Sequence, residues 1–198
     1  MKAKIYLEGG GDSKELHSRC REGFRKLLES TGYRGRMPQL VACGSRDSTY
    51  HDFLTAHANS NADYIAMLVD SEDPVRDPEK TWDHLQERDG WERPDGGDDG
   101  QVLFMTTCME TWIASDPDTL RRHYGGCFRE SALLPLKNIE RRERREIQES
   151  LKDATRGCSN AYQKGQRSFE VLGALNPAAL EDRLAAFRRM KRIMDERL

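Results

Sequence analysis

The chain has 198 residues, which suits one domain, or one domain with a helical appendage, and is enough for a sizeable core. Apolar residues make up 36% of it and charged residues 33%, and no apolar run approaches the roughly 20 residues that cross a bilayer, which argues against a membrane or disordered protein. The net charge of −2 excludes general basicity as a way of holding nucleic acid, so such a partner would need a local basic patch or metal ions.

The N-terminal residues and the cysteines indicate the compartment. The stretch MKAKIYLEGG reads as a strand and lacks the longer apolar core and small-residue cleavage site of a signal peptide, so we expect a cytoplasmic protein. The cysteines are odd in number and scattered without a CxxC pair, which disfavours a disulfide framework or a zinc site. We therefore expect reduced thiols at Cys20, Cys43, Cys108, Cys127 and Cys158.

The part of the chain up to Asp70 alternates between strand and helix patterns. A glycine turn at Gly9–Gly11 follows the first strand, and Asp12 with Glu15 has the spacing of a capping box. The run DYIAMLVD is nearly all apolar and ends in acids, as buried parallel strands do. The predicted elements are a strand over Lys2–Leu7, a helix from Leu16 to Leu28 that stops at Gly32, a strand over Met37–Cys43, a short helix over Ser48–His57 and a strand over Asp63–Asp70.

The rest of the chain predicts one more strand and several helices. Strand and helix alternation predicts an α/β fold, with a Rossmann-like parallel sheet of about four strands flanked by helices. We divide the chain into an α/β core over residues 1–125 and a mainly helical part over residues 126–198 that packs on it. The predicted elements are a short helix over Thr81–Glu87, an acidic loop up to Gly100, a strand over Gln101–Thr107, helical segments from Cys108 to Leu120, a charged helix over Ile139–Ala154 and a last helix from Pro177 to Leu198.

Acidic residues follow three of the predicted strands. Glu8 ends the first, Asp70 and Glu72 end the third, and Glu110 lies just past the fourth. Ligands of parallel α/β sheets bind beyond the carboxyl ends of the strands, so these side chains would converge on one edge. Hard oxygen ligands suit Mg²⁺ or Mn²⁺ rather than zinc, and without a cation the carboxylates would repel one another. The sequence therefore predicts a site for Mg²⁺ or Mn²⁺.

The glycines do not form a nucleotide-binding loop. Lys14 stands where the Rossmann fingerprint needs its third glycine, and no glycine precedes Lys14 as the Walker motif requires. Single acids at strand ends also cap helices, which is the alternative role for Glu110. The alternative for Trp112, on the short helix beside Glu110, is a core aromatic, and for Lys164 it is a solvated surface residue.

Several of these segments together resemble the Toprim domain, the metal-dependent module of type IA and II topoisomerases, bacterial primases and OLD-family nucleases. A strand ending in Glu8 and Gly9 leads through a glycine turn to a helix, and a later strand ends in Asp70-x-Glu72. The chain is most similar to a group of small bacterial stand-alone Toprim-fold proteins associated with ABC- or OLD-type ATPases. The segments that recur in that group read here EGGGDSKEL, VDSED, METWIASD over 109–116 and Tyr162-Gln163-Lys164.

The resemblance implies a Toprim-type nuclease that performs metal-dependent phosphodiester chemistry on nucleic acid, as the effector of an antiphage defence system with an ATPase partner. Toprim domains most often carry Asp-x-Asp where this chain has Asp70-x-Glu72. The resemblance therefore predicts that a metal binds here, but it does not define where the metal lies. The sequence does not decide whether the protein forms a homodimer. The expected site residues are Glu8, Asp70, Glu72 and Glu110 as catalytic metal ligands, Lys164 as a catalytic cation, and Gly9, Gly10, Gly11 and Trp112 in substrate binding.

Two alternatives belong to other classes. The first is a non-catalytic Toprim-like module that binds an ATPase partner or nucleic acid, and the second is a phosphatase or nucleotidyl-transfer enzyme on a related sheet. Basic clusters that could contact phosphates lie at 121–123, 141–145 and 188–192. Glu143 and Glu146 flank or interrupt the middle one, which predicts a salt-bridged helix face there. The sequence leaves the choice between DNA and RNA open.

Overall fold

A parallel sheet lies at the centre of the computed structural model, which describes residues 2–59 and 61–198; within these residues the sheet has four strands. The strand order is β2-β1-β3-β4, and every neighbouring pair is parallel. This confirms the predicted α/β, Rossmann-like sheet. The strands are β1 (Ala3–Gly10), β2 (Gln39–Gly44), β3 (Tyr64–Asp70) and β4 (Val102–Met105).

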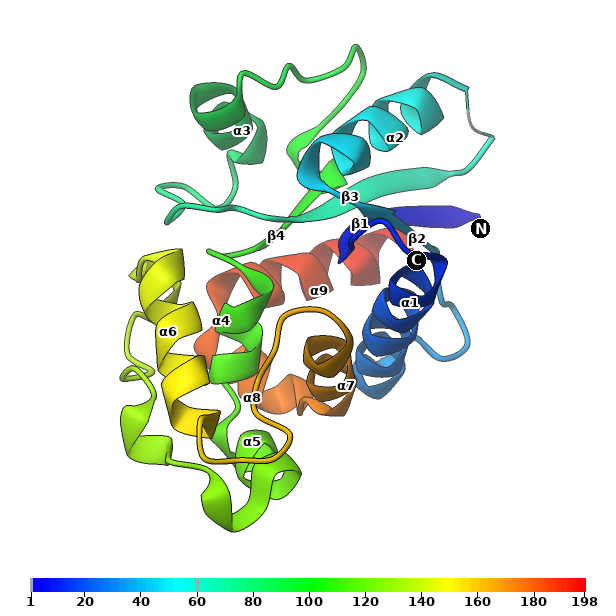
Figure 1. Cartoon of the computed structure of the whole chain (residues 1–198). Coiled ribbons are helices and arrows are strands. Elements are labelled where there is room, and N and C mark those ends of the chain that lie inside the picture. The colour runs from blue at the N-terminus through cyan, green and yellow to red at the C-terminus, as the bar shows by residue number, and fades with distance from the viewer. Residues whose placement is uncertain (1, 60) are drawn as a thin grey trace.

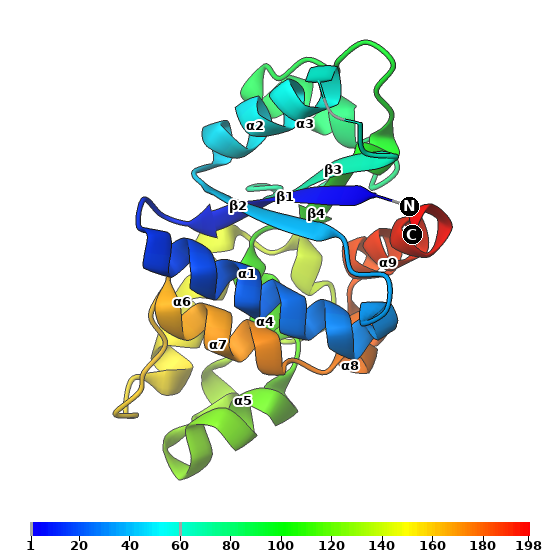
Figure 2. The same ribbon diagram turned by 90° about the vertical axis from the view of Figure 1, so that its right-hand side faces the viewer.

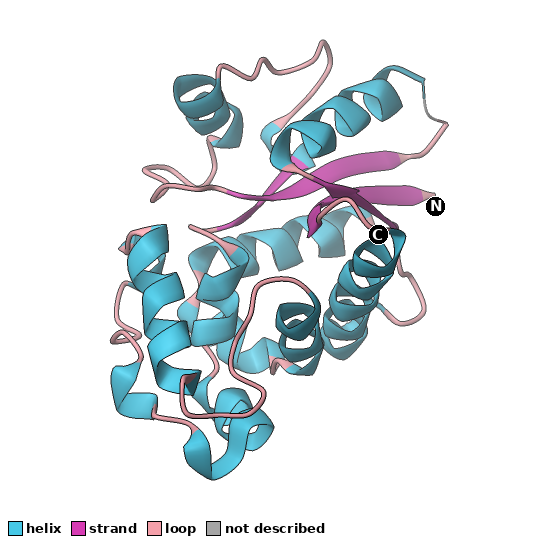
Figure 3. Ribbon diagram, in the orientation of Figure 1, coloured by secondary structure: helices cyan, strands magenta, loops and turns pink. Residues whose placement is uncertain are grey.

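Helices cover both faces of the sheet, as Figure 3 shows. On one face, α2 (Arg46–Asn59) and α3 (Thr81–Asp89) bury Phe53, Trp82 and Leu85 against it. The other face is covered by α1 (Lys14–Leu28), α4 (Met109–Ala114) and α9 (Ala185–Arg197), in the thicker layer below the sheet in Figure 1. The other α-helices of the described residues are α5 (Pro117–Tyr124), α6 (Arg144–Thr155), α7 (Gln166–Ala174) and α8 (Pro177–Arg183).

The buried strand β3 and the amphipathic helix α1 follow directly from their sequences. All seven residues of β3 are buried, as its apolar run predicts for a strand covered on both faces. The helix α1 turns Cys20, Phe24 and Leu27 to the core at helical spacing. Its N-cap is Ser13, whose side chain accepts the N–H of Leu16, so the predicted capping box at Asp12 is wrong by one residue.

Predicted boundaries differ from the structure where tertiary contacts decide them. The charged helix predicted from Ile139 is split, because a 3₁₀ turn (Ile139–Arg141) precedes α6. The predicted last helix breaks at Leu184, where Glu140 accepts the N–H groups of Ala185 and Ala186 at 2.7 and 3.0 Å and so caps a new helix, α9. The helix α7 was not predicted, because its nine residues give weak start and stop signals; it packs along α1 (Figure 2).

Residues on both sides of the expected division at residue 125 share one hydrophobic core. This core runs from Ala3 in β1 to Met194 in α9 and includes Phe169 of α7. The buried Arg189 of α9 also donates to the carbonyl oxygens of Val102 and Asp99, at 2.9 and 2.7 Å. The C-terminal helices are thus part of the packing that supports β4. No helix among the described residues has the length and apolar character needed to cross a membrane.

The expectation of five reduced thiols is wrong for one pair. Cys127 and Cys158 form a disulfide, with their Cα atoms 5.3 Å apart. The two segments meet because the N–H of Arg129 donates to the carbonyl oxygen of Ala154 at 2.8 Å, a contact that cysteine spacing does not indicate. The remaining cysteines, Cys20, Cys43 and Cys108, are free.

Replacement of Asp116 by Ala should destabilise the protein by roughly 2–4 kcal/mol. Its buried carboxylate accepts the N–H of Thr119 at the start of α5 and the N–H of Asn176 before α8, at 3.1 and 2.8 Å. Hydrogen bonds to a charged group contribute about 1.5–3 kcal/mol each, and both donors would be left unpaired. Denaturant unfolding measures the change, with Asp116→Asn as the control that keeps one acceptor and should lose about half as much. An Asp116→Ala protein as stable as the parent would contradict this structural role.

Candidate metal centre

Glu8 lies at an irregular end of β1. The pairing of β1 with β2 shifts register after Leu7, so that Glu8, Gly9 and Gly10 all lie opposite Gly44. This bulge turns the Glu8 side chain toward the neighbouring strand β3, where its Oε2 accepts the backbone N–H of Asp70 at 3.0 Å. The first carboxylate is therefore held by the main chain of the strand that supplies the second.

Asp70 is the last residue of β3 and is 4% exposed. Its Oδ1 accepts the N–H of Met109, the first residue of α4, at 2.8 Å. This contact joins the carboxyl end of β3 to the segment that follows β4. The side chain is fixed at the sheet edge where α/β sheets bind their ligands.

Glu72 lies just beyond β3 in a tight turn. Its φ of 66° is in the left-handed region that non-glycine residues rarely adopt. The turn is held by two backbone hydrogen bonds to the end of β4, from Ser71 N–H to Met105 and from Glu72 N–H to Thr107, at 3.1 and 2.8 Å. The conformation keeps the Glu72 carboxylate beside Asp70, and backbone strain of this kind clusters at functional sites.

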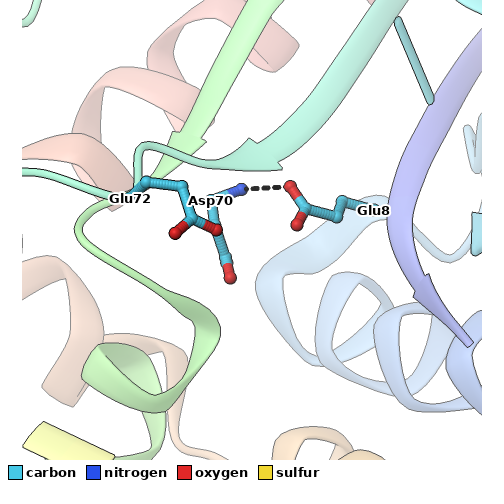
Figure 4. Close-up of side chains that lie close together, drawn as sticks. All are labelled: Glu8, Asp70 and Glu72. Atoms are coloured by element: carbon cyan, nitrogen blue, oxygen red, sulfur yellow. Dashed lines mark hydrogen bonds between the residues drawn. The ribbon is translucent and has the colours of Figure 1, made fainter. Parts of the chain in front are cut away.

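The three carboxylates lie around one small space, shown in Figure 4. One ligand oxygen from each of Glu8, Asp70 and Glu72 lies within 4.8 Å of the other two. In each carboxylate, one oxygen accepts a hydrogen bond from the protein. The other oxygens, Glu8 Oε1, Asp70 Oδ2 and Glu72 Oε1, have no hydrogen bond to another described residue. An oxygen-only donor set with open positions fits a hard cation such as Mg²⁺ or Mn²⁺.

Electrostatics also favour a cation at this place. Burial raises the pKa of Glu8, an effect that the charge of Glu72 increases and that Arg46 and the Asp70 N–H oppose. Burial, followed by the charges of Glu8 and Glu110, raises the pKa of Asp70 well above its ordinary value. Both shifts mean that the ionised carboxylates are costly to hold together here. A divalent cation would offset that cost.

Arginines surround the acids, and their pairing is not evident from the sequence. Arg46, at the start of α2, contacts the carbonyl oxygen of Asp70, lies 3.4 Å from Glu8 Oε2 and pairs with Asp89 at 2.7 Å. Its guanidinium also lies over the ring of Trp91, 4.7 Å from the centroid. These contacts join residues far apart in sequence, so no local pattern indicates them.

Two further arginines approach Glu72. Arg144, at the start of α6, forms a close ion pair with Glu72 Oε2, and Arg88 lies 3.8 Å from the same oxygen. The Glu72 side chain is 15% exposed and that of Arg144 is 28% exposed, so this pair is only partly screened by water. Arg144 and Arg88 together supply positive charge beside Glu72.

Glu110 has different surroundings from the other acids. It is 1% exposed, with Oε1 accepting the hydroxyl of Tyr162 at 2.8 Å and Oε2 lying 3.4 Å from Gln148 Nε2. Burial works to raise the pKa of Glu110, but the charge of Lys164 and the Tyr162 hydrogen bond outweigh it and lower that pKa. Glu110 lies outside the group of three acids, so these contacts do not support the prediction that it is a metal ligand. They do bring together the METWIASD and Tyr-x-Lys segments.

A cavity of about 370 Å³ opens beside the acids. The predicted glycines line it, and at Gly10 and Gly44 a side chain would collide: a Cβ would lie 2.8 Å from the His17 ring and 2.5 Å from the Gly11 carbonyl oxygen, respectively. Both also have positive φ, so glycine is required there. Further lining residues are Glu8, Asp70, Glu110, Lys164, Ser168 and Phe169.

Trp112 does not reach this cavity. Its ring is fully buried between Phe24 and Phe187, with centroid distances of 6.5 and 5.1 Å. Protein atoms cover it on all sides, so the prediction that it binds substrate is wrong. Its place next to Glu110 on a short helix suggested proximity to the site, but residues two apart on a helix lie on different sides of it.

Replacement of Arg144 by Gln should tighten Mn²⁺ binding about fivefold. The positive charge of Arg144 competes with a cation for Glu72, and a partly exposed ion pair contributes up to about 1 kcal/mol, which corresponds to roughly a fivefold change in affinity. Titration calorimetry with Mn²⁺ measures the change. The matched control is Arg145→Gln, since Arg145 pairs with the exposed Glu149 and not with the acids. Equal or weaker Mn²⁺ binding by the Arg144→Gln protein would contradict the competition.

Comparisons with known proteins identify a family without naming an activity. Neither the curated proteins nor the solved structures give a match to this chain. One family model does match, over residues 7–194, and it includes Glu8, the 70–72 turn, Glu110 and Lys164. The match covers nearly the whole chain, and the protein therefore belongs to the family described as "Domain of unknown function (DUF4276)".

Proposed function

We propose that the protein is a Mg²⁺- or Mn²⁺-dependent nuclease that hydrolyses phosphodiester bonds of nucleic acid. The observation that carries the proposal is the convergence of Glu8, Asp70 and Glu72 within 4.8 Å, each with an open oxygen, at the carboxyl edge of a parallel sheet. A cavity that can admit part of a substrate lies directly beside them. The resemblance to Toprim nucleases supports the same reading of these acids.

The three acids would hold the metal through Glu8 Oε1, Asp70 Oδ2 and an oxygen of Glu72. A bound divalent cation neutralises the charge of a phosphodiester and stabilises the oxygen that leaves. In the hydrolysis, a water oxygen bonds to phosphorus, the bond from phosphorus to one sugar oxygen breaks, and a proton from water passes to that oxygen. The hydrogen bonds from the Asp70 and Met109 N–H groups hold two of the carboxylates in place for this step.

Lys164 is the cation best placed to contact the substrate phosphate. It lines the cavity together with Glu8 and Asp70, and its charge acts on both Asp70 and Glu110. Glu110 is a positioning residue in this proposal. Its buried carboxylate attracts Lys164, and it also accepts the hydroxyl of Tyr162, which lies two residues before Lys164 in the chain. The glycines at the end of β1 allow a substrate backbone to come close to the acids.

Cleavage assays with Mn²⁺ test the proposal. Single-stranded DNA, duplex DNA and RNA are incubated with the purified protein, alone and with an ABC- or OLD-type ATPase partner. Asp70→Asn and Glu8→Gln should each lower the cleavage rate by about a hundredfold or more, because each removes a charged metal ligand. The control is Asp73→Asn, which removes a neighbouring exposed acid that pairs with Arg88.

Chelation by EDTA should abolish cleavage, and added Mn²⁺ should restore it. Failure to cleave any of these substrates, with metal and with the ATPase, would reject the nuclease and favour a non-catalytic module. Cleavage that survives in both Asp70→Asn and Glu8→Gln would place the chemistry elsewhere.

A further inference from the structure

We infer that a basic loop, defined as residues 135–142, is the docking surface on which a nucleic-acid strand lies as it enters the acidic site; this inference rests on the proposed function. The loop surrounds a second cavity of about 380 Å³. Three basic side chains line it, namely Lys137, Arg141 and Arg142. Among residues 2–59 and 61–198, none of these three side chains forms an ion pair or a hydrogen bond.

The expected salt-bridged face over residues 141–145 forms only in part. Arg144 pairs with Glu72 and Arg145 with Glu149, whereas no ion pair within the described residues joins Arg141 or Arg142 to Glu143 or Glu146. Arg141 and Arg142 lie in the turn before α6, so the helical spacing that would pair them with the glutamates does not apply.

The backbone turns the loop's only acid inward and leaves its cations outside. Ile139 is 1% exposed, and the next residue, Glu140, faces α9, where it accepts two backbone N–H groups. The N–H of Arg141 donates to Asn138 and the N–H of Arg142 to Ile139, at 2.9 and 3.1 Å. Lys137 and Arg141 are exposed and Arg142 is half-buried. Within residues 135–142, the loop's acid is therefore engaged with α9, while its three basic side chains are unpaired.

The loop is connected to the acidic site by hydrogen bonds. The carbonyl oxygen of Arg142 accepts the hydroxyl of Thr107 at 3.3 Å, and the carbonyl oxygen of Thr107 accepts the N–H of Glu72 at 2.8 Å. Two residues farther on, Arg144 contacts the Glu72 carboxylate itself. Figure 1 shows one end of α6 beside the ends of β3 and β4. Through Thr107, the backbone at the end of the loop is thus joined to the turn that carries Glu72.

The chemistry of this surface fits a chain of phosphates. A single phosphate at the acids would leave the three cations of the loop without a ligand, whereas a strand places further phosphates on either side of the one that is cleaved. A nucleic-acid strand is also repelled by Glu8, Asp70 and Glu72 until a cation binds. A neighbouring surface with unpaired positive charge would offset this repulsion and hold the strand in place.

The test compares binding and chemistry in one triple variant, Lys137→Gln/Arg141→Gln/Arg142→Gln. Its matched control is Lys2→Gln/Lys4→Gln/Arg34→Gln, which also loses three positive charges. These residues lie at or shortly before the amino ends of β1 and β2, at the edge of the sheet opposite the acids. Fluorescence anisotropy with labelled DNA and RNA strands in Ca²⁺ measures affinity against salt concentration. Hydrolysis of bis(p-nitrophenyl) phosphate, which carries one phosphate and no strand, measures the chemistry separately.

The loop variant should bind the strands at least about tenfold more weakly, with a salt slope lower by roughly 2–3 than that of the parent, since each lost phosphate contact lowers it by about one. Its hydrolysis of the small diester and the binding of the control variant should match the parent. Unchanged strand binding by the loop variant would overturn the inference, as would a parent protein that binds polyglutamate as tightly as the strands. If no protein hydrolyses the small diester or any strand, the proposed function fails, while loop-dependent strand binding would still support the docking surface.

Discussion

The hydrogen bond from the backbone N–H of Asp70 to Glu8 Oε2 is the contact on which the acidic site depends. It joins the carboxyl ends of β1 and β3, which are neighbours in the sheet because the chain crosses over to place β1 between β2 and β3. It also brings the half-buried Glu8 carboxylate beside the buried Asp70 carboxylate, which is unfavourable unless positive charge compensates them. The arginines around the site supply part of this positive charge.

Arginines and open carboxylate oxygens share the same site. Arg46 binds the engaged oxygen of Glu8, and Arg144 and Arg88 approach one oxygen of Glu72, so the protein supplies part of the positive charge itself. The other oxygen of each of the three carboxylates has no hydrogen bond to a described residue. The basic loop extends the positive charge away from the site along the path that we infer for the substrate.

The sequence predicts the acidic residues of the site, but not the arginine that pairs with Glu72. Strand patterns locate the carboxyl ends of β1 and β3, and parallel topology then brings Glu8, Asp70 and Glu72 to one edge. The pairing of Arg144 with Glu72 joins residues that no local pattern relates. Trp112 was misplaced because its position beside Glu110 in the sequence does not show which side of α4 the core covers. The disulfide and the break at Leu184 likewise depend on contacts between distant segments.

A crystal of the protein soaked in Mn²⁺ would test the central claim most directly, through the anomalous scattering of the metal. The account predicts a peak in the space between Glu8 Oε1, Asp70 Oδ2 and the Glu72 carboxylate, with ligand distances of about 2.0–2.3 Å. It also predicts that Arg144 moves away from the oxygen that it now contacts. A well-ordered crystal with no peak among these three residues, or with manganese only at the exposed acids of the loop over residues 95–99, would contradict it.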